Sequence, residues 1–266
     1  MDRTLLSRTW SGLLFAAVLL GAVCWRPESA CAVLFLLALG VLREFYQVWL
    51  QPSGKWKWLA MLPGVYLLAV TCAFLYGKTG PLWFAGLVPV MLVLMVTELY
   101  ASGSDPLRRQ SVIWWGVAYI AVPFALMMHL ATQPDGQRLL PGFFLLAWVN
   151  DSGAYLIGIT FGKHRLMPRI SPLKSWEGFW GGAFCALAVS LLLSRWLGVL
   201  PPWGWLAVAV LAVVCGVFGD LFESMLKRGL GLKDSGRFMP GHGGMLDRFD
   251  AVLTSFPMVW LYLMIC

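Results

Sequence analysis

The chain contains a series of apolar runs that approach or exceed the length of a membrane span. A helix needs roughly 20 residues to cross the hydrocarbon core of a bilayer. Hydrophobic residues make up 59% of the 266 positions and charged residues only 12%, which excludes an ordinary soluble globule. We expect an all-α, polytopic integral membrane protein. The runs predict about nine transmembrane helices, at residues 10–25, 29–50, 56–76, 80–100, 112–131, 139–160, 178–198, 203–222 and 249–266.

The first run resembles a secretory signal peptide, because Arg3 and Arg8 precede an apolar core. No small-x-small cleavage site follows it convincingly, and further apolar runs come directly after it. We therefore interpret it as a retained first span.

Lys and Arg are unevenly divided between the two sides that these nine spans define. Sixteen of the twenty lie on the amino-terminal side, and the other side receives only Arg26, Lys78, Arg138 and Arg195. The positive-inside rule then predicts a cytoplasmic amino terminus and an external carboxyl terminus, as in a bacterial inner membrane. The net charge of +7 fits basic loops that meet anionic headgroups, so it does not argue for a nucleic-acid partner.

A polar segment, residues 220–250, lies between the last two spans and faces the cytoplasm in this topology. Ionisable groups near a bilayer are costly unless they are paired, metal-bound or hydrated, so they mark a candidate functional site. The acids of this segment are Asp220, Glu223, Asp234, Asp247 and Asp250, and its bases are Lys227, Arg228, Lys233, Arg237 and Arg248.

Four side chains at the start of the polar segment share one helical face. Asp220, Glu223, Ser224 and Lys227 follow the spacing i, i+3, i+4 and i+7. A solvated helix end with an ordinary Glu223–Lys227 pair would also show this spacing. However, Asp220 follows an apolar run directly, so its desolvation predicts a cationic partner.

Glycines surround the histidine of the segment, and two aspartates follow them. Gly243 and Gly244 beside His242 would let backbone N–H groups approach a phosphate, although a simple turn has the same composition. Asp247 and Asp250 are expected on one face at the start of the last helix, where an acid can also act as a cap. Carboxylates, bases and a glycine loop together indicate Mg²⁺ and a polyphosphate.

A second group of polar residues precedes the seventh span and lies on the same side of the predicted membrane. Asp151 stands inside an apolar run and is therefore a functional candidate. Pro172 suits the first turn of a helix with Ser171 as its cap. An ordinary surface pair of Lys174 with Glu177 is the alternative to a functional role for these two residues.

The chain is expected to divide by role. Residues 1–138 would form supporting helices with lipid contacts and a possible dimer surface. Residues 139–266 would form the catalytic region, with a polar pocket at the cytoplasmic side and cytoplasmic loops at 161–177 and 220–250. The acids of the first part are expected at membrane interfaces in structural roles: Glu44, Glu98 and Asp105.

The polar segment resembles the signature of the phosphatidate cytidylyltransferase (CDP-diacylglycerol synthase) family in residues and spacing: Ser224-x-Leu226-Lys227-Arg228, then Lys233-Asp234, then Pro240-x-His242-Gly243-Gly244-Met245-x-Asp247-Arg248-Phe249-Asp250. Met239 stands where the family usually has Leu, Ile or Phe. An upstream motif of the family is similar to Asp151-x-x-Ala154-Tyr155 and Ser171-Pro172-x-Lys174-Ser175-Trp176-Glu177-Gly178. The amino-terminal half matches only in having several apolar spans.

The resemblance implies an enzyme that makes CDP-diacylglycerol and pyrophosphate from CTP and phosphatidate, on a homodimeric membrane fold. It implies a metal site on Asp220 and Asp247 that takes Mg²⁺, with a second monovalent or divalent cation as an option. The predicted catalytic residues are Asp220, Lys227, Asp234, His242, Asp247 and Asp250. The predicted substrate-binding residues are Lys174, Ser224, Arg228, Lys233, Gly243, Gly244 and Arg248, and the supporting residues are Asp151, Glu177 and Glu223.

Two other functions use comparable parts. A CTP-dependent kinase of a polyprenol-type lipid alcohol would need a base for a neutral hydroxyl, and its product would contain no cytidine. An ion or phosphate transporter with intramembrane carboxylates would show paired broken helices in two related halves. Because the charges here gather in one loop and its flanks, the transporter is the more distant alternative.

Overall fold

The computed structural model describes residues 3–51, 54–101, 105–233, 235–236 and 243–266, with side chains from residue 12 onward. Within these ranges, seven helices are long and apolar enough to cross a membrane. Two shorter apolar helices occupy Gly12–Trp25 and Asp250–Ile265. The chain is a predominantly helical, multi-pass membrane protein, and the count of nine spans stays a prediction.

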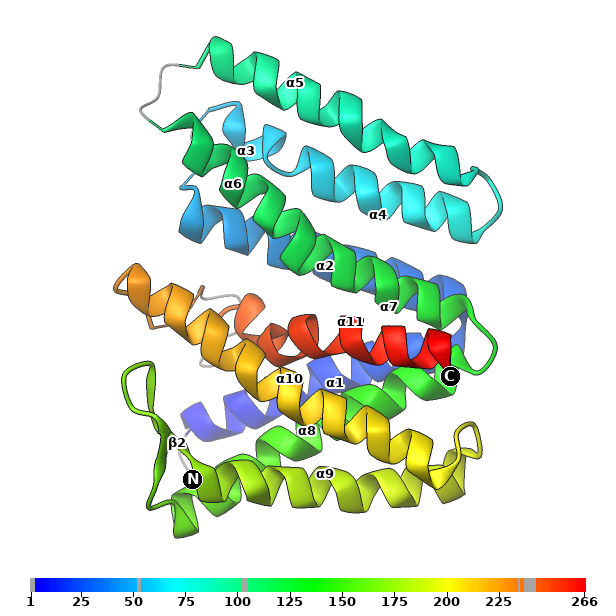
Figure 1. The fold of residues 1–266 in the computed structure, drawn as a ribbon, viewed down its shortest axis with the longest axis vertical. Coiled ribbons are helices and arrows are strands. Elements are labelled where there is room, and N and C mark those ends of the chain that lie inside the picture. The colour runs from blue at the N-terminus through cyan, green and yellow to red at the C-terminus, as the bar shows by residue number, and fades with distance from the viewer. Residues whose placement is uncertain (1–2, 52–53, 102–104, 234, 237–242) are drawn as a thin grey trace. The chain divides into compact units, whose positions relative to one another are not determined.

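The elements appear in Figure 1. In chain order they are α1 (Arg3–Trp25), α2 (Pro27–Trp49), α3 (Trp56–Leu59), α4 (Leu62–Leu75), the 3₁₀ helix η1 (Pro81–Gly86), α5 (Leu87–Leu99), α6 (Pro106–Gly116), the π-helical turn η2 (Val117–Ala121), α7 (Val122–Thr132), α8 (Gly136–Phe161), β1 (Arg165–Met167), β2 (Ser171–Ser175), α9 (Trp176–Leu197), α10 (Pro202–Gly229), the 3₁₀ helix η3 (Leu246–Arg248) and α11 (Asp250–Ile265).

Most helices follow the predicted spans, but α1 and α6 begin several residues earlier than expected and α10 ends later. Helices α2 and α9 each begin and end within two residues of their predicted bounds. Helix α10 continues beyond the expected end at residue 222 and reaches Gly229. Its polar end remains helical. The first residue after this helix with a left-handed backbone is Gly231, at φ +71°.

The chain forms two compact units. The first comprises residues 1–132 and 235–246, and the second comprises residues 133–234 and 247–266. In the first unit α2 packs against α1, α6 and α7, and α4 packs against α5 and α7. In the second unit α9 contacts both α8 and α10, and α10 also contacts α11 (Figure 1).

Helices α8 and α9 approach each other through glycines. A Cβ atom at Gly182 would lie 2.5 Å from the carbonyl oxygen of Asn150, and one at Gly178 would lie 2.8 Å from that of Ala154. Small residues allow such close approach of membrane helices, because dispersion contacts and not water exclusion hold them together. The glycine face of α9 thus fixes the position of α8 around Asn150 and the adjacent Asp151.

The segment before α9 is an antiparallel β-hairpin made of β1 and β2, which corrects the expected helix start at Ser171 and Pro172. Proline is tolerated there because both strands of a two-stranded hairpin are edges. Helix α9 begins later, with Ser175 as its cap, and the Ser175 Oγ accepts a hydrogen bond of 3.2 Å from the Gly178 N–H.

Large apolar side chains cover much of the outer surface. Only 6% of the most apolar stretch of Pro81–Leu99 is buried within the chain. Leu99, Phe184 and Trp196 are all mostly exposed. Apolar surface of this extent is unfavourable in water but suits contact with lipid acyl chains, in agreement with a membrane-spanning fold.

Candidate active site

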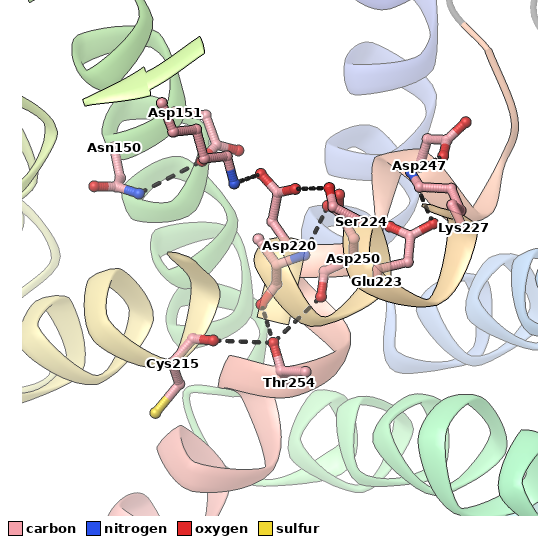
Figure 2. Close-up of polar contacts among 12 residues, drawn as sticks. Asn150, Asp151, Cys215, Asp220, Glu223, Ser224, Lys227, Asp247, Asp250 and Thr254 are labelled. Carbon is pink, nitrogen blue, oxygen red and sulfur yellow. Dashed lines mark hydrogen bonds and ion pairs between the residues drawn. The ribbon is translucent and has the colours of Figure 1, made fainter. Parts of the chain in front are cut away.

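The carboxyl-terminal end of α10 carries the four polar side chains on one face, as expected. The Ser224 Oγ donates a hydrogen bond of 3.3 Å to the Asp220 Oδ1. One turn further, the Lys227 Nζ lies 3.2 Å from the Glu223 Oε1. Figure 2 shows these side chains beside one another.

Asp220 has the cationic partner that its desolvation predicted. The Nζ of Lys174 forms an ion pair with the Asp220 Oδ2, and both side chains are partly buried. The alternative, a surface pair of Lys174 with Glu177, is excluded by these contacts. Those residues would face each other only within one helix, whereas Lys174 belongs to strand β2 and α9 begins after it.

Glu177 instead holds the chain between α8 and β1. Its carboxylate accepts hydrogen bonds from the backbone N–H of Lys163, at 3.1 Å, and of His164, at 3.2 Å. The His164 Nδ1 lies 2.6 Å from the Glu177 Oε1. Glu177 therefore fastens the base of the hairpin that carries Lys174.

Lys227 connects α10 to η3. Its Nζ lies 2.6 Å from the Asp247 Oδ1 and 3.2 Å from the Glu223 Oε1. The three side chains are almost enclosed, with exposed fractions of 9% for Lys227, 12% for Asp247 and 0% for Glu223. Removing one partner from such a group leaves an uncompensated buried charge.

Asp247 and Asp250 lie in different elements, which corrects the expectation of a shared helical face. Asp247 belongs to the 3₁₀ turn η3, and Asp250 is the first residue of α11. The Asp250 Oδ1 accepts a hydrogen bond of 2.7 Å from the Ala251 N–H, and the charges of Asp220 and Glu223 act on the Asp250 carboxyl. Neighbouring acids of this kind favour a proton or a cation among them.

Asp151 adds a further acid from α8. The Asn150 Nδ2 lies 3.5 Å from its Oδ1, and the charge of Asp220 acts on both Asp151 and Asp250. Thr254 connects α11 to α10, because its Oγ1 donates to the Cys215 carbonyl oxygen at 3.1 Å (Figure 2). The second unit thus gathers an acid–base cluster made of Asp151, Lys174, Asp220, Glu223, Ser224, Lys227, Asp247, Arg248 and Asp250.

The remaining predicted site residues lie near the end of α10, in the first unit or beyond the described ranges. Arg228 is exposed and donates a hydrogen bond of 3.2 Å to the Leu232 carbonyl oxygen, near the end of α10. Lys233 is also exposed. Gly243, at φ +79°, and Gly244 belong to the first unit. The predictions for Asp234 and His242 fall outside the described residues.

Sequence reasoning missed the environment of Glu44. It is buried inside the protein and accepts backbone hydrogen bonds from Met245 and Leu246, contacts that the sequence did not indicate. An acid inside the apolar run of α2 was the available signal. The other two acids make contacts that fit structural roles: Glu98 forms a 2.8 Å ion pair with Arg109, and Asp105 caps α6.

The acid–base cluster fits a divalent cation in its chemistry, although it is not a complete metal cage. In the described ranges, no three His, Cys, Asp or Glu side chains surround one point as metal ligands would. Mg²⁺ commonly takes only one or two carboxylates and completes its shell with water and substrate phosphates. The charge of Glu223 acts on Asp250, and neighbouring acids of this kind favour a cation nearby.

The sequence matches the model of the cytidylyltransferase family over residues 6–266, which is nearly its full length. The chain belongs to the cytidylyltransferase family. For such an enzyme, bases that lie among acids at the end of a membrane helix supply the charges that a nucleoside triphosphate and a cation require.

Three relatives of this cytidylyltransferase carry the name phosphatidate cytidylyltransferase. The protein of Staphylococcus epidermidis is 33% identical over 230 residues, 85% of this chain and 86% of the relative. That of Staphylococcus haemolyticus is 30% identical over 258 residues, 95% of this chain and 96% of the relative. That of Staphylococcus aureus is 44% identical over 144 residues, 54% of this chain and 55% of the relative.

Proposed function

We propose that this cytidylyltransferase transfers the cytidylyl group of CTP to phosphatidate, giving CDP-diacylglycerol and pyrophosphate. The observation that carries the proposal is the acid–base cluster at the end of the apolar helix α10, where Lys174 and Lys227 each contact an acid. Its position suits a reaction between a nucleotide from water and a lipid from the bilayer. The same substrates are supported by relatives that are named phosphatidate cytidylyltransferase and that align with most of this chain.

The reaction needs positioning and charge neutralisation more than an activated nucleophile. A phosphate oxygen of phosphatidate is already anionic and attacks the α-phosphorus of CTP. A new phosphorus–oxygen bond forms, the bond between the α- and β-phosphates breaks, and pyrophosphate leaves with the electron pair. The barrier comes from bringing two polyanions together, so fixed positive charges lower it.

Lys174 and Lys227 are the cations best placed for this role. Each has a flexible stem and a compact ammonium group, and each contacts a carboxylate that can alternatively hold a metal ion. When phosphates and a cation enter, each ammonium group can turn from its carboxylate to a phosphate oxygen. Other groups are proposed to bind the triphosphate and the lipid phosphate: Ser224, Arg228, Lys233, His242, Gly243, Gly244 and Arg248.

Asp220 and Asp247 are the proposed ligands of Mg²⁺, with Glu223, Asp234 and Asp250 as further ligands or their supports. A bound Mg²⁺ would neutralise phosphate oxygens and favour departure of pyrophosphate. A second cation is compatible with this surplus of acids. Asp151 would support the charge balance around Asp220.

The location is inferred from the charge distribution, and the assembly from the family resemblance. The bias of Lys and Arg supports a cytoplasmic amino terminus, with the site on the cytoplasmic face of a bacterial inner membrane. Residues 1–138 would then supply supporting and lipid-facing helices. Homodimerisation rests on the family resemblance.

The test is an assay of purified protein in detergent with CTP, phosphatidate and Mg²⁺. We expect pyrophosphate and a lipid that retains a label placed on cytosine. Transfer of label only from the γ-phosphate to a polyprenol-type alcohol would instead show a lipid kinase. No chemical turnover, together with ion or phosphate uptake into proteoliposomes, would show a transporter.

A further inference from the structure

Glu44 of α2 is enclosed by a segment two hundred residues further along the chain. Its Oε2 accepts a hydrogen bond of 2.8 Å from the Met245 N–H, and its Oε1 accepts one of 3.0 Å from the Leu246 N–H. The hydroxyl of Ser235 donates to the same Oε1. With only 9% of the residue exposed, this carboxylate depends on these donors to replace its lost hydration.

Two glycines of the segment make room for the carboxylate. A Cβ atom at Gly236 would lie 2.8 Å from the Glu44 Cδ and Oε2. One at Gly244 would overlap the Glu44 Oε1. Gly244, which the sequence suggested as a phosphate contact, therefore packs against a carboxylate of the protein itself.

A second contact, next to the first, holds the same segment. The Met245 side chain packs on Gly40, one helical turn before Glu44, where a Cβ atom would overlap the Met245 Sδ. Both described parts of the segment, 235–236 and 243–246, are thus fastened to α2 inside the first unit. Neither contact is local in sequence.

The fastened segment ends directly before Asp247 in the chain. The N–H groups of Met245 and Leu246 belong to the two residues that precede Asp247, and Asp247 itself contacts Lys227. Holding these two N–H groups restricts where the backbone can deliver the Asp247 carboxylate. An error of about 1 Å in such a group is enough to slow a reaction by roughly a hundredfold.

We propose that Glu44 is a positioning residue for cytidylyl transfer: it fastens Ser235, Gly236 and residues 244–246 to α2 and thereby sets the backbone that leads into Asp247. This inference rests on the proposed function. It assigns a role in the reaction to a carboxylate outside the acid–base cluster and outside the motif of the polar segment.

The first test replaces Glu44 by Gln, which keeps the side-chain shape but places an amide NH₂ against a backbone donor. We expect kcat per folded molecule to fall about tenfold or more, with little change in the KM for phosphatidate. The matched control is Glu28→Gln, an exposed acid on the same helix, which should keep the parent activity. An E44Q enzyme within about twofold of the parent kcat would overturn the proposal.

A second test separates positioning from a general loss of folding. Gly236→Ala should reduce kcat in the parent, because the new methyl group meets Glu44. In a Glu44→Ala background the same substitution should cost little, since the space is then vacant. Equal effects in both backgrounds would show that Gly236 and Glu44 do not act through one contact and would overturn the proposal.

A third readout does not depend on activity. Tryptic cleavage after Lys233 or Arg237, mapped by mass spectrometry, should be faster in E44Q than in the parent and in E28Q. Equal cleavage rates would overturn the fastening of the segment. A parent enzyme that makes no CDP-diacylglycerol, but in which E44Q still accelerates cleavage, would overturn the proposed function and the catalytic role while leaving the contact intact.

Discussion

Among single residues, Asp220 shows how an acid is accommodated directly after an apolar stretch. It receives the ammonium group of Lys174 from the hairpin and the hydroxyl of Ser224 from its own helix. A bound cation can take the place of the ammonium group, which is then free to contact a phosphate. The same description applies to Asp247 with Lys227.

Replacing Asp220 or Asp247 by Asn tests their proposed role as ligands. The charge that would hold Mg²⁺ is lost while the side-chain shape stays the same, so we expect formation of the cytidine-bearing lipid to fall by about a hundredfold or more. Membrane insertion and yield should be unchanged. Asp135→Asn, at an exposed acid with a left-handed backbone that Asn tolerates, is the control. Full activity in both variants would exclude the metal assignment.

Lys227→Met tests the energetics of the enclosed charges. It leaves Glu223 and Asp247 without their shared cation, and breaking a buried ion pair costs about 3–5 kcal/mol. We expect the unfolding free energy in detergent to fall by that order, measured by denaturant titration of circular dichroism. The neighbouring Arg228→Met, on an exposed side chain, should change it by less than about 0.5 kcal/mol.

At the scale of elements, the contact between α8 and α9 determines where Asp151 lies. The glycines of α9 leave space for the backbone of α8 at Asn150, one residue before Asp151. The β-hairpin then returns the chain from α8 to α9 and presents Lys174 to Asp220. Helix packing and a short hairpin together assemble one side of the cluster.

Gly182→Ala should therefore weaken both stability and activity. The added methyl group would meet the Asn150 carbonyl oxygen at 2.5 Å, so the helices must separate, at a cost of about 1–3 kcal/mol. Thermal unfolding in detergent and the CDP-diacylglycerol assay measure the two effects. Gly21→Ala, where no atom lies within 4 Å of the added methyl group, should leave both unchanged; equal losses in the two variants would contradict the packing argument.

At the scale of the whole molecule, whether the number of spans is odd or even determines on which side of the membrane the carboxyl terminus lies. Seven long apolar helices and two shorter ones are described. Helix α11 has only 16 residues, which is just below the usual length of a membrane span. If all nine helices cross the membrane, the two termini lie on opposite sides.

Reporter fusions test this parity. A phosphatase fused after Cys266 should be active and a fluorescent protein there should be dark, because we expect an external carboxyl terminus. Fusions after Lys163 should show the reverse, since that loop is expected in the cytoplasm with most of the Lys and Arg. If the fusions after Cys266 gave the opposite result while those after Lys163 behaved as expected, the second part of the chain would have fewer spans than predicted.

Much of the element structure was predictable, because apolar length and helical spacing are local properties. The start of α9 was not, since Ser171 and Pro172 suit either a helix cap or an edge strand. Pairing across the antiparallel hairpin chose the strand. The shared face of Asp220, Glu223, Ser224 and Lys227 followed from spacing alone and is confirmed.

The sequence by itself determined that this chain crosses a membrane in helices, carries a cytidylyltransferase signature and needs counter-charges for Asp220. Only the tertiary structure decided which counter-charges these are. Lys174 lies 46 positions from Asp220, and Leu246 lies 202 positions from Glu44. Helical hydrogen bonds join residues four apart, so they can be recognised in a short stretch of sequence. A buried charge accepts any donor that the fold brings within about 3 Å, and sequence spacing does not reveal which one that is.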